Sequence, residues 1–405
     1  MKPTSTSKKS APASAAPSAP VTPGLDQPWT LLGGMSAQTF MRKHWQKKPL
    51  LIRQAIPGIS SPISRAALFE LAGRDDVESR LIVQGHGTQS AKKAAPAWAL
   101  HHGPIARTRI PKLNQSGWTL LVQGLDLHVP AAHELLKQFR FVPDARMDDL
   151  MISYASDGGG VGPHYDSYDV FLLQVHGQRR WRIGPIQDAT LLPDMPVKIL
   201  ANFEPQEEHV LEPGDMLYLP PRWAHDGIAQ GECMTCSVGF RVPETTELAR
   251  EVLTRLTEAL EPDDPPKLYK DPKQGATAEP GRIPAELQQF ALEAVTRALK
   301  DPIALQTALG EMLSEPKPRV WFDLSDEPLA DGLGVVLDPK TRMMYDDHCI
   351  YANGESWRAA GGDARVLREL ADRRSLPASV VAKVSPALRS LLDQWVDDGW
   401  LHPAP

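Results

Sequence analysis

The 405-residue sequence predicts an α+β fold, with a β-rich domain first and helices after it. Residues 50–242 are made of short apolar or alternating runs separated by Gly, Pro and Asp, a pattern typical of a β-sandwich or barrel. From residue 243 onward the apolar residues recur with a helical period, as in TTELAREVLTRLTEALE. The C-terminal part combines a hairpin pattern, GVVLDPKTRMMYDDHCIYANG, with further helical runs, which indicates a small winged-helix-like module.

These changes of pattern divide the chain into segments. The N-terminal segment is rich in Ala, Ser and Pro and has almost no large apolar residues, so we expect it to be disordered. A short capped helix in SAQTFMRK should then open the folded chain. We expect a disordered tail over 1–27, the β-rich domain over 28–243, a helical segment over 244–317 and the winged-helix-like domain over 318–405.

The composition is that of a soluble cytoplasmic protein. Hydrophobic residues make up 42% and charged residues 23% of the chain, and no apolar run reaches the roughly 18 residues of a membrane helix. Three cysteines, an odd number, argue against a disulfide framework and favour a reducing compartment. The net charge of −6 lacks the basic character of a nucleic-acid-binding protein. We therefore expect no direct nucleic-acid binding and a basic protein or peptide as partner.

His164 and Asp166, in GGGVGPHYDSYD, are candidate metal ligands. Alternate residues of a strand point to the same face, so both side chains can reach one ion. His225, in EPGDMLYLPPRWAHDG, is the best third ligand, at the far end of a strand after two prolines. Two histidines and one carboxylate leave three metal positions open, as in non-haem iron(II) oxygenases. A His–Asp pair alone is more often merely solvated, but the glycine-rich lead-in and the context of His225 favour a metal site.

Arg179 is predicted to point into the β-rich domain. In RRWRI, Arg179, Trp181 and Ile183 share one strand face, and Trp and Ile mark that face as interior. Arg180 and Arg182 should then be solvated on the outer face. A buried cation is costly unless it meets an anion. We expect that anion to be a carboxylate of a cosubstrate beside the metal, held by the guanidinium fork; an internal salt bridge is the alternative.

With these residues in place, the chain resembles the JmjC-type 2-oxoglutarate- and iron(II)-dependent oxygenases of the cupin type, and specifically the bacterial ribosomal oxygenases. The matching stretches include HWQKKPLLIR, DDLMISYASDGGGVGPHYDSYDVFLLQVHGQRRWRIG, LEPGDMLYLPPRWAHDG, SVGFRVPETTEL and IYANGES. The family implies a double-stranded β-helix catalytic domain, a helical dimerisation segment and a C-terminal winged helix. It also implies hydroxylation of the β carbon of an arginine in large-subunit ribosomal protein sixteen, with Fe(II), 2-oxoglutarate and O₂.

The resemblance also implies roles for the candidate residues. His164, Asp166 and His225 match the iron ligands. Arg179 matches the residue that binds the distal carboxylate of 2-oxoglutarate, and Ser153 matches a hydroxyl on the same wall that helps to hold it. No catalytic acid or base is expected beyond the iron site.

The substrate side of the site is predicted from strand alternation in DDLMIS. Asp149, Met151 and Ser153 share one face, so Asp149 should line the same cavity and could bind a substrate guanidinium. Tyr168 and Ser237 are further substrate-binding candidates, although such residues near strand ends are as often structural. Asp157, Asp169 and Asp226 are expected to make the neighbourhood attractive to a basic substrate.

Two other functions fit some of the same residues. A JmjC N-methyl demethylase uses the same iron chemistry, so only the substrate pocket separates it from a hydroxylase. A metal-binding cupin module without catalysis would have no use for Arg179. For assembly, family resemblance predicts a homodimer through the helices of residues 245–313. Leu253, Leu256 and Leu260, spaced three and four apart, should lie on the buried face.

Overall fold

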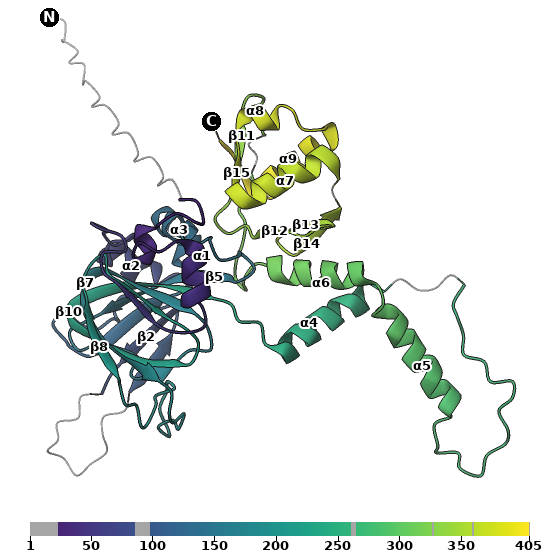
Figure 1. Ribbon diagram of the computed structural model, residues 1–405, viewed down its shortest axis with the longest axis horizontal. Coiled ribbons are helices and arrows are strands. Elements are labelled where there is room, and N and C mark those ends of the chain that lie inside the picture. Colours follow the sequence, from purple (N-terminus) through teal and green to yellow (C-terminus); the bar gives the residue numbers. More distant parts are fainter. Residues whose placement is uncertain (1–22, 86–97, 261–264, 326–327, 359, 405) are drawn as a thin grey trace, which may run out of the picture.

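The computed structural model describes residues 23–85, 98–260, 265–325, 328–358 and 360–404 (Figure 1). Most of the expected disordered tail, residues 1–22, lies outside the described residues. The remainder of that segment contacts the folded domain. The indole of Trp29 donates to the Gly24 carbonyl at 3.2 Å, and the Gln38 N–H donates to the Leu25 carbonyl at 3.2 Å. Gly24 and Leu25, within the segment expected to be disordered, therefore make contacts with the folded domain.

The β-rich domain is built on a large antiparallel sheet that curls into a barrel, with short helices α1, α2 and α3 on one side of it (Figure 1). Along the sheet the strands follow the order β1-β9-β7-β10-β5-β4-β2-β3, while β6 pairs with β10 and β8 with β7. The elements are 3₁₀ helix η1 (Thr30–Leu32), α1 (Ala37–Lys43), β1 (Leu50–Ile52), α2 (Arg65–Leu71), β2 (Ser79–Val83), β3 (Ala99–His102), β4 (Trp118–Val122), η2 (Leu125–Leu127), α3 (Pro130–Lys137), β5 (Met147–Ala155), β6 (His164–Tyr165), β7 (Val170–Pro185), β8 (Glu207–Leu211), β9 (Met216–Leu219) and β10 (Trp223–Phe240).

The two longest strands, β7 and β10, hold the barrel together. They pair along most of their length, with a shift of register between Gln230 and Met234. Gly177 lies opposite that irregularity with a φ of 61°, and a Cβ there would be 2.1 Å from the Glu232 carbonyl oxygen, so the bend requires glycine. Because β10 runs through both halves of the barrel, it carries His225 near its start and Ser237 near its end.

The main hydrophobic core lies between the sheet and the short helices. Leu150, Ile152 and Tyr154 of β5 are fully buried in it, together with Phe40 of α1. Successive residues of a strand face opposite sides. Asp149 and the other residues that alternate with these core residues therefore face the interior of the barrel, as the alternation in the sequence predicts.

The predicted first helix is confirmed as α1. Ser36 caps it, with its hydroxyl accepting the Thr39 N–H at 3.2 Å. A polar cap of this kind satisfies one of the N–H groups that the first turn of a helix leaves without a partner. The helix ends against the barrel, where the Phe40 ring stacks edge-on against Tyr218.

Three helices follow the barrel: α4 (Thr245–Glu258), α5 (Ala285–Ala298) and α6 (Pro302–Ser314). Helix α5 projects away from both other parts of the chain, and none of its residues is buried (Figure 1). In and just beyond α4, Leu256 is 7% exposed, whereas Leu253 and Leu260 are 45% and 56% exposed. Within one chain these leucines do not form a common buried face, so the predicted pairing of two chains stays a prediction.

Helix α6 packs on the C-terminal domain. A Cβ at Gly310 would lie 2.2 Å from the Tyr351 ring, and the Tyr351 hydroxyl donates to the Gln306 carbonyl at 3.3 Å. The C-terminal elements are β11 (Gly334–Leu337), β12 (Met343–Tyr345), β13 (Cys349–Ala352), β14 (Glu355–Arg358), α7 (Gly361–Arg373), β15 (Ser375–Leu376), α8 (Ala378–Val381), α9 (Pro386–Asp397) and β16 (Leu401–Ala404).

The hairpin predicted over residues 334–354 is only partly right. Strands β12 and β13 form it and β14 extends it, but β11 leaves to pair with β15 and with β16 at the chain end. Pro339, one residue beyond the end of β11, has no N–H to donate, so the ladder cannot continue into the hairpin. Among the described residues, no helix is long and apolar enough to cross a membrane.

Candidate metal centre

The pairing of β6 with β10 brings the three candidate ligands together. In the register of that pair, His164 lies directly opposite His225. One possible ligand atom from each of His164, Asp166 and His225 lies within 4.8 Å of the others. The Nε2 atom of His225 is 3.7 Å from Asp166 Oδ2. The two histidines of the predicted triad thus lie on neighbouring strands that are not consecutive in the chain, and Asp166 directly follows β6.

Both imidazoles are oriented by backbone carbonyls. His164 Nδ1 donates to the Gly162 carbonyl at 2.8 Å, and His225 Nδ1 donates to the Trp223 carbonyl at 3.0 Å. A ring that donates through Nδ1 keeps a lone pair on Nε2, which is the atom free to bind a metal. Burial, with a smaller contribution from the neighbouring His164 ring, lowers the pKa of His225 to about 4. His225 is therefore neutral at physiological pH, the form that ligates metals.

The glycine run before β6 lets the backbone pass close to the strands around the triad. A Cβ at Gly160 would lie 2.5 Å from the Gly227 carbonyl oxygen, and one at Gly159 would lie 2.4 Å from the Trp118 carbonyl oxygen. After β6, the Asp166 carbonyl accepts the Arg222 N–H at 2.8 Å. These contacts fix the segment that carries His164 and Asp166.

Arg179 points into the barrel, as its strand position predicts. Arg179, Trp181 and Ile183 are 5%, 5% and 0% exposed. The Arg179 Nη1 donates to Ser153 Oγ at 3.1 Å, while its Nε and Nη2 are buried and have no hydrogen-bond partner among the residues that the structure describes. Over the described ranges, no carboxylate forms an ion pair with Arg179, so the internal salt bridge is not what the structure shows. The N–H groups on these two nitrogens of a buried cation are left for an anion to satisfy.

Trp181 links this cation to the triad. Its ring centroid lies 5.8 Å from that of His225, and the Arg179 guanidinium carbon lies 5.7 Å from the Trp181 ring centroid. Ser153 lies on β5 opposite Thr235 of β10, where its hydroxyl also donates to the Thr235 carbonyl at 3.4 Å. The predicted anion anchor and the triad therefore belong to one interior wall of the barrel.

Asp149 is buried, as predicted, but its carboxylate already has partners. Its Oδ2 accepts the Gly124 N–H at 3.0 Å and the Gln123 side-chain amide at 3.3 Å, and lies 3.0 Å from Lys317 Nζ. Lys317 follows α6, far along the chain. No sequence pattern marks it, because it belongs to no periodic element, and sequence reasoning missed it.

The other two substrate candidates lie near the same wall. Ser237 is 8% exposed and lies opposite Met151 of β5; directly opposed residues of two strands share a face. Tyr168 lies in the connection between β6 and β7 and is partly exposed. Burial and the Asp166 carboxylate, with a further contribution from Asp149, raise the pKa of Tyr168.

Two sequence expectations about charges are wrong. Arg182 is half-buried and pairs with Asp226, which is 4% exposed, so neither is a free surface charge. Asp169 is fully buried and accepts the Tyr218 hydroxyl. A buried carboxylate needs such partners, so Asp169 and Asp226 are not available to attract a substrate. Arg180 is half-buried, and its Nη1 lies 3.8 Å from Glu208 Oε2. The Asp157 carboxylate accepts the Gly231 N–H at 2.8 Å.

Two protein-family models match this sequence and define the class of protein. The sequence matches the model of the JmjC domain over residues 134–248 and that of the ROXA-like winged helix over residues 297–402. The first match contains the triad and Arg179, and the second takes in α6 with the C-terminal domain. The chain is thus a JmjC-domain protein with a winged helix, and the predicted antiparallel barrel of the JmjC and cupin type is confirmed.

Similar proteins identify the family within this class. The chain is 30% identical over 90% of its length to a probable ribosomal oxygenase of Haemophilus influenzae, 96% of which is covered. It is 35% identical over 78% of its length to the ribosomal protein uL16 3-hydroxylase of Escherichia coli, 84% of which is covered. It also matches the solved structure of YcfD, a ribosomal oxygenase from Escherichia coli in complex with cobalt and 2-oxoglutarate, with 30% identity and a TM-score of 0.73 over 91% of this chain and 98% of that one. The chain belongs to the bacterial ribosomal oxygenases.

Proposed function

We propose that this chain is a 2-oxoglutarate- and Fe(II)-dependent oxygenase that hydroxylates the β carbon of an arginine in a large-subunit ribosomal protein. The observation that carries the proposal is the buried Arg179 on the same wall as the triad, with two nitrogens that lack hydrogen-bond partners among the described residues. A metal site alone needs no such cation. A cosubstrate with two acidic ends, one at the metal and one at Arg179, accounts for both features.

The donor set fits the metal. His164, Asp166 and His225 would hold Fe(II) through two neutral nitrogens and one carboxylate oxygen, and leave positions for the cosubstrate and O₂. Bound iron would supply O₂ activation: 2-oxoglutarate and O₂ give succinate and CO₂, and one oxygen atom enters a C–H bond of the substrate. The solved relative with cobalt and 2-oxoglutarate supports this pairing of metal and cosubstrate.

The chain's own residues contribute binding and orientation. Arg179 and the Ser153 hydroxyl would bind the distal carboxylate of 2-oxoglutarate. Because Arg179 is buried, that pair forms away from water, where charge-assisted hydrogen bonds are stronger. Trp181 and Ile183 line the wall beside it and exclude water from the site.

The substrate side supports arginine. Asp149 lies on the same strand face as Ser153, four residues along β5, and a carboxylate matches the fork of a guanidinium. A guanidinium held there would bring a carbon of the arginine stem, rather than the terminal nitrogens, toward the metal. The name of the E. coli relative, uL16 3-hydroxylase, supports the choice of carbon, since carbon 3 of an amino acid is its β carbon. Tyr168 and Ser237 would contact the substrate nearby.

We also propose a substrate, a cellular compartment and a dimeric assembly for this activity. The substrate is a basic ribosomal protein, which places the reaction in the cytoplasm. Two chains pair through the region of α4 and α5, where several apolar side chains are exposed in the single chain: Leu253, Leu260, Leu292 and Val295.

The decisive test is turnover of peptides by the Fe(II)-loaded protein. Peptides from the large-subunit protein, each with its arginine or with lysine in its place, are incubated with 2-oxoglutarate and analysed by mass spectrometry. The proposal expects one added oxygen atom on the arginine and an equal amount of succinate. Formaldehyde release from N-methylated peptides without oxygen on arginine would indicate a demethylase. A metal-loaded protein that forms no succinate with any peptide would be a binding module only.

A further inference from the structure

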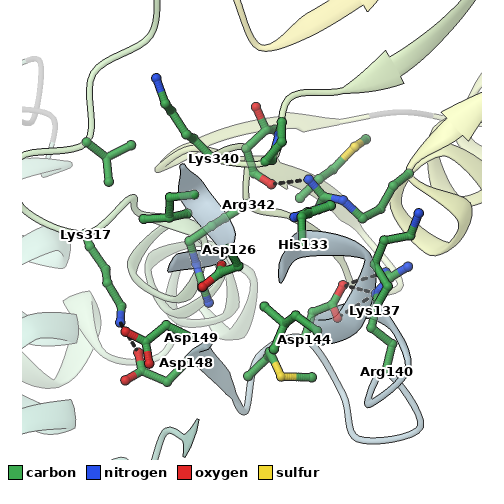
Figure 2. Close-up of a pocket in the computed structure, with 18 of the residues that line it drawn as sticks. Asp126, His133, Lys137, Arg140, Asp144, Asp148, Asp149, Lys317, Lys340 and Arg342 are labelled. Carbon is green, nitrogen blue, oxygen red and sulfur yellow. Dashed lines mark hydrogen bonds and ion pairs between the residues drawn. The ribbon is translucent and has the colours of Figure 1, made fainter. Parts of the chain in front are cut away.

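Lys317 joins the segment after α6 to the substrate side of the barrel. Its Nζ lies 2.9 Å from Asp148 Oδ1 and 3.0 Å from Asp149 Oδ2, and Figure 2 shows the side chain extended toward both carboxylates. Lys317 lies between Pro316 and Pro318, so the backbone on either side is stiff. The ammonium thus reaches the carboxylate that the proposed function assigns to the substrate.

Space surrounds this ion pair. Lys317 lines a cavity of about 80 Å³ that also contains Asp126 and Arg342 (Figure 2). It also lines a larger cavity of about 620 Å³, between the Gln123 side of the barrel and the segment that leads to Trp321. A third cavity, of about 580 Å³, lies on the side of α4. Asp149 lines the first two. The lysine head can therefore move, and another side chain can approach Asp149, without unfolding either domain.

The two carboxylates depend on Lys317 to different degrees. Asp148 also accepts the Arg241 Nε at 3.3 Å, so it keeps a cation when Lys317 leaves. Asp149 is 4% exposed, and within the described part of the chain Lys317 is the cation that pairs with it. Removing the partner of a buried charge is strongly unfavourable. Lys317 therefore leaves the ionised Asp149 carboxylate most readily when another cation takes its place.

We propose, building on the proposed function, that Lys317 occupies the guanidinium subsite of the substrate and determines specificity for arginine over lysine. The substrate arginine enters by exchange: its guanidinium replaces the ammonium on Asp149, so the carboxylate keeps one cationic partner. A planar guanidinium can bind a carboxylate through two N–H groups, whereas an ammonium acts as a point charge. The guanidinium of arginine therefore binds Asp149 more strongly than the ammonium that it displaces. A substrate lysine would have to displace an identical ammonium that is tethered in place and so present at high effective concentration.

Amine labelling of the wild-type protein tests the exchange directly. The cobalt- and 2-oxoglutarate-loaded enzyme is treated with formaldehyde and a hydride reductant, and methylation of each lysine is followed by mass spectrometry. We expect Lys317 to react several-fold faster when the arginine peptide is present, but not with the same peptide carrying lysine or glutamine. Lys47, which donates to the Arg42 carbonyl at 2.6 Å and lines none of these three cavities, is the internal control and should not change. An unchanged Lys317 rate with the arginine peptide bound would overturn the proposal.

Substitution tests the specificity. Lys317→Met removes the charge but keeps the length, and should tighten binding of both peptides by about tenfold or more, since the subsite is then open. The lysine peptide should gain most, and Lys317→Arg should not tighten either. In an Asp149→Asn background, Lys317→Met should no longer tighten the binding of either peptide. Unchanged or weaker peptide binding by Lys317→Met would refute the role.

These outcomes are distinct from those of the proposed function. If the wild-type enzyme hydroxylates no arginine peptide, the proposed function fails. If it hydroxylates arginine while Lys317 labelling and the affinity of Lys317→Met do not change, this inference alone fails. Should Lys317→Met unfold, the labelling of the wild-type protein still decides.

Discussion

His164 lies directly opposite His225 across the β6–β10 pair, with the two ring centroids 4.3 Å apart. Each ring donates its Nδ1–H to a carbonyl two residues away in its own strand segment, Gly162 for one and Trp223 for the other. The strand register and these local hydrogen bonds together aim both Nε2 atoms at the same point, beside the Asp166 carboxylate.

The first prediction concerns these ligands. His164→Ala or His225→Ala should abolish 2-oxoglutarate turnover, because iron held by two ligands is lost or changes its geometry. Metal titration by calorimetry should show weakened binding in both variants. His209→Ala is the matched control, since His209 lies on β8 and pairs with Glu207. Near-normal succinate formation by either ligand variant would rule out the metal assignment.

Arg179→Ala should leave metal binding intact and weaken 2-oxoglutarate binding at least about 100-fold, since an unpaired buried charge costs about 3–5 kcal/mol. The measurement is 2-oxoglutarate affinity, by calorimetry, on cobalt-loaded protein. Arg180→Ala, one residue along on the opposite face of β7, should bind 2-oxoglutarate normally. Equal affinities for the two variants would move the anchor to another residue.

Asp149→Asn should lose hydroxylation of the arginine peptide while it still binds metal and 2-oxoglutarate. The reason is that a neutral amide cannot balance the charge of a buried guanidinium. Asp148→Asn is the matched control, because Asp148 is more exposed and shares Lys317. Wild-type activity of Asp149→Asn on the peptide would show that the substrate is anchored elsewhere.

The chain should form a homodimer. Light scattering should give twice the chain mass of 44.5 kDa. Leu292→Glu, on α5, should shift the protein toward the monomer without unfolding it, since Leu292 is 59% exposed in the single chain. A monomer mass for the wild type at micromolar concentration would contradict the prediction.

The packing of α6 on the C-terminal domain should contribute to the stability of the protein. Gly310→Ala should destabilise the protein by about 1–3 kcal/mol, because its methyl group would overlap the Tyr351 ring. Gly362→Ala in α7 has open space around the new methyl group and should be neutral or slightly stabilising. Thermal unfolding of the two variants gives the comparison. An unchanged melting temperature for Gly310→Ala would mean that α6 moves away from Tyr351 at little cost.

Local periodicity accounts for most of what could be predicted about the site. Alternation along a strand put His164 with Asp166, Arg179 with Trp181, and Asp149 with Ser153, and the structure keeps each pair on one face. The third ligand depended on its sequence context, and resemblance to a family supplied the roles.

The sequence by itself determined which side chains face the interior of the barrel, because strand alternation is a property of the local backbone. The tertiary structure alone decided which partner each buried charge has. Within the part of the chain that the structure describes, Arg179 faces Ser153 and no carboxylate, Arg182 pairs with Asp226, and Asp149 pairs with Lys317 from beyond α6. Such pairs form between segments that are distant in the chain. They depend on strand register and on how the last domain packs against the barrel, and neither leaves a periodic signal in the sequence.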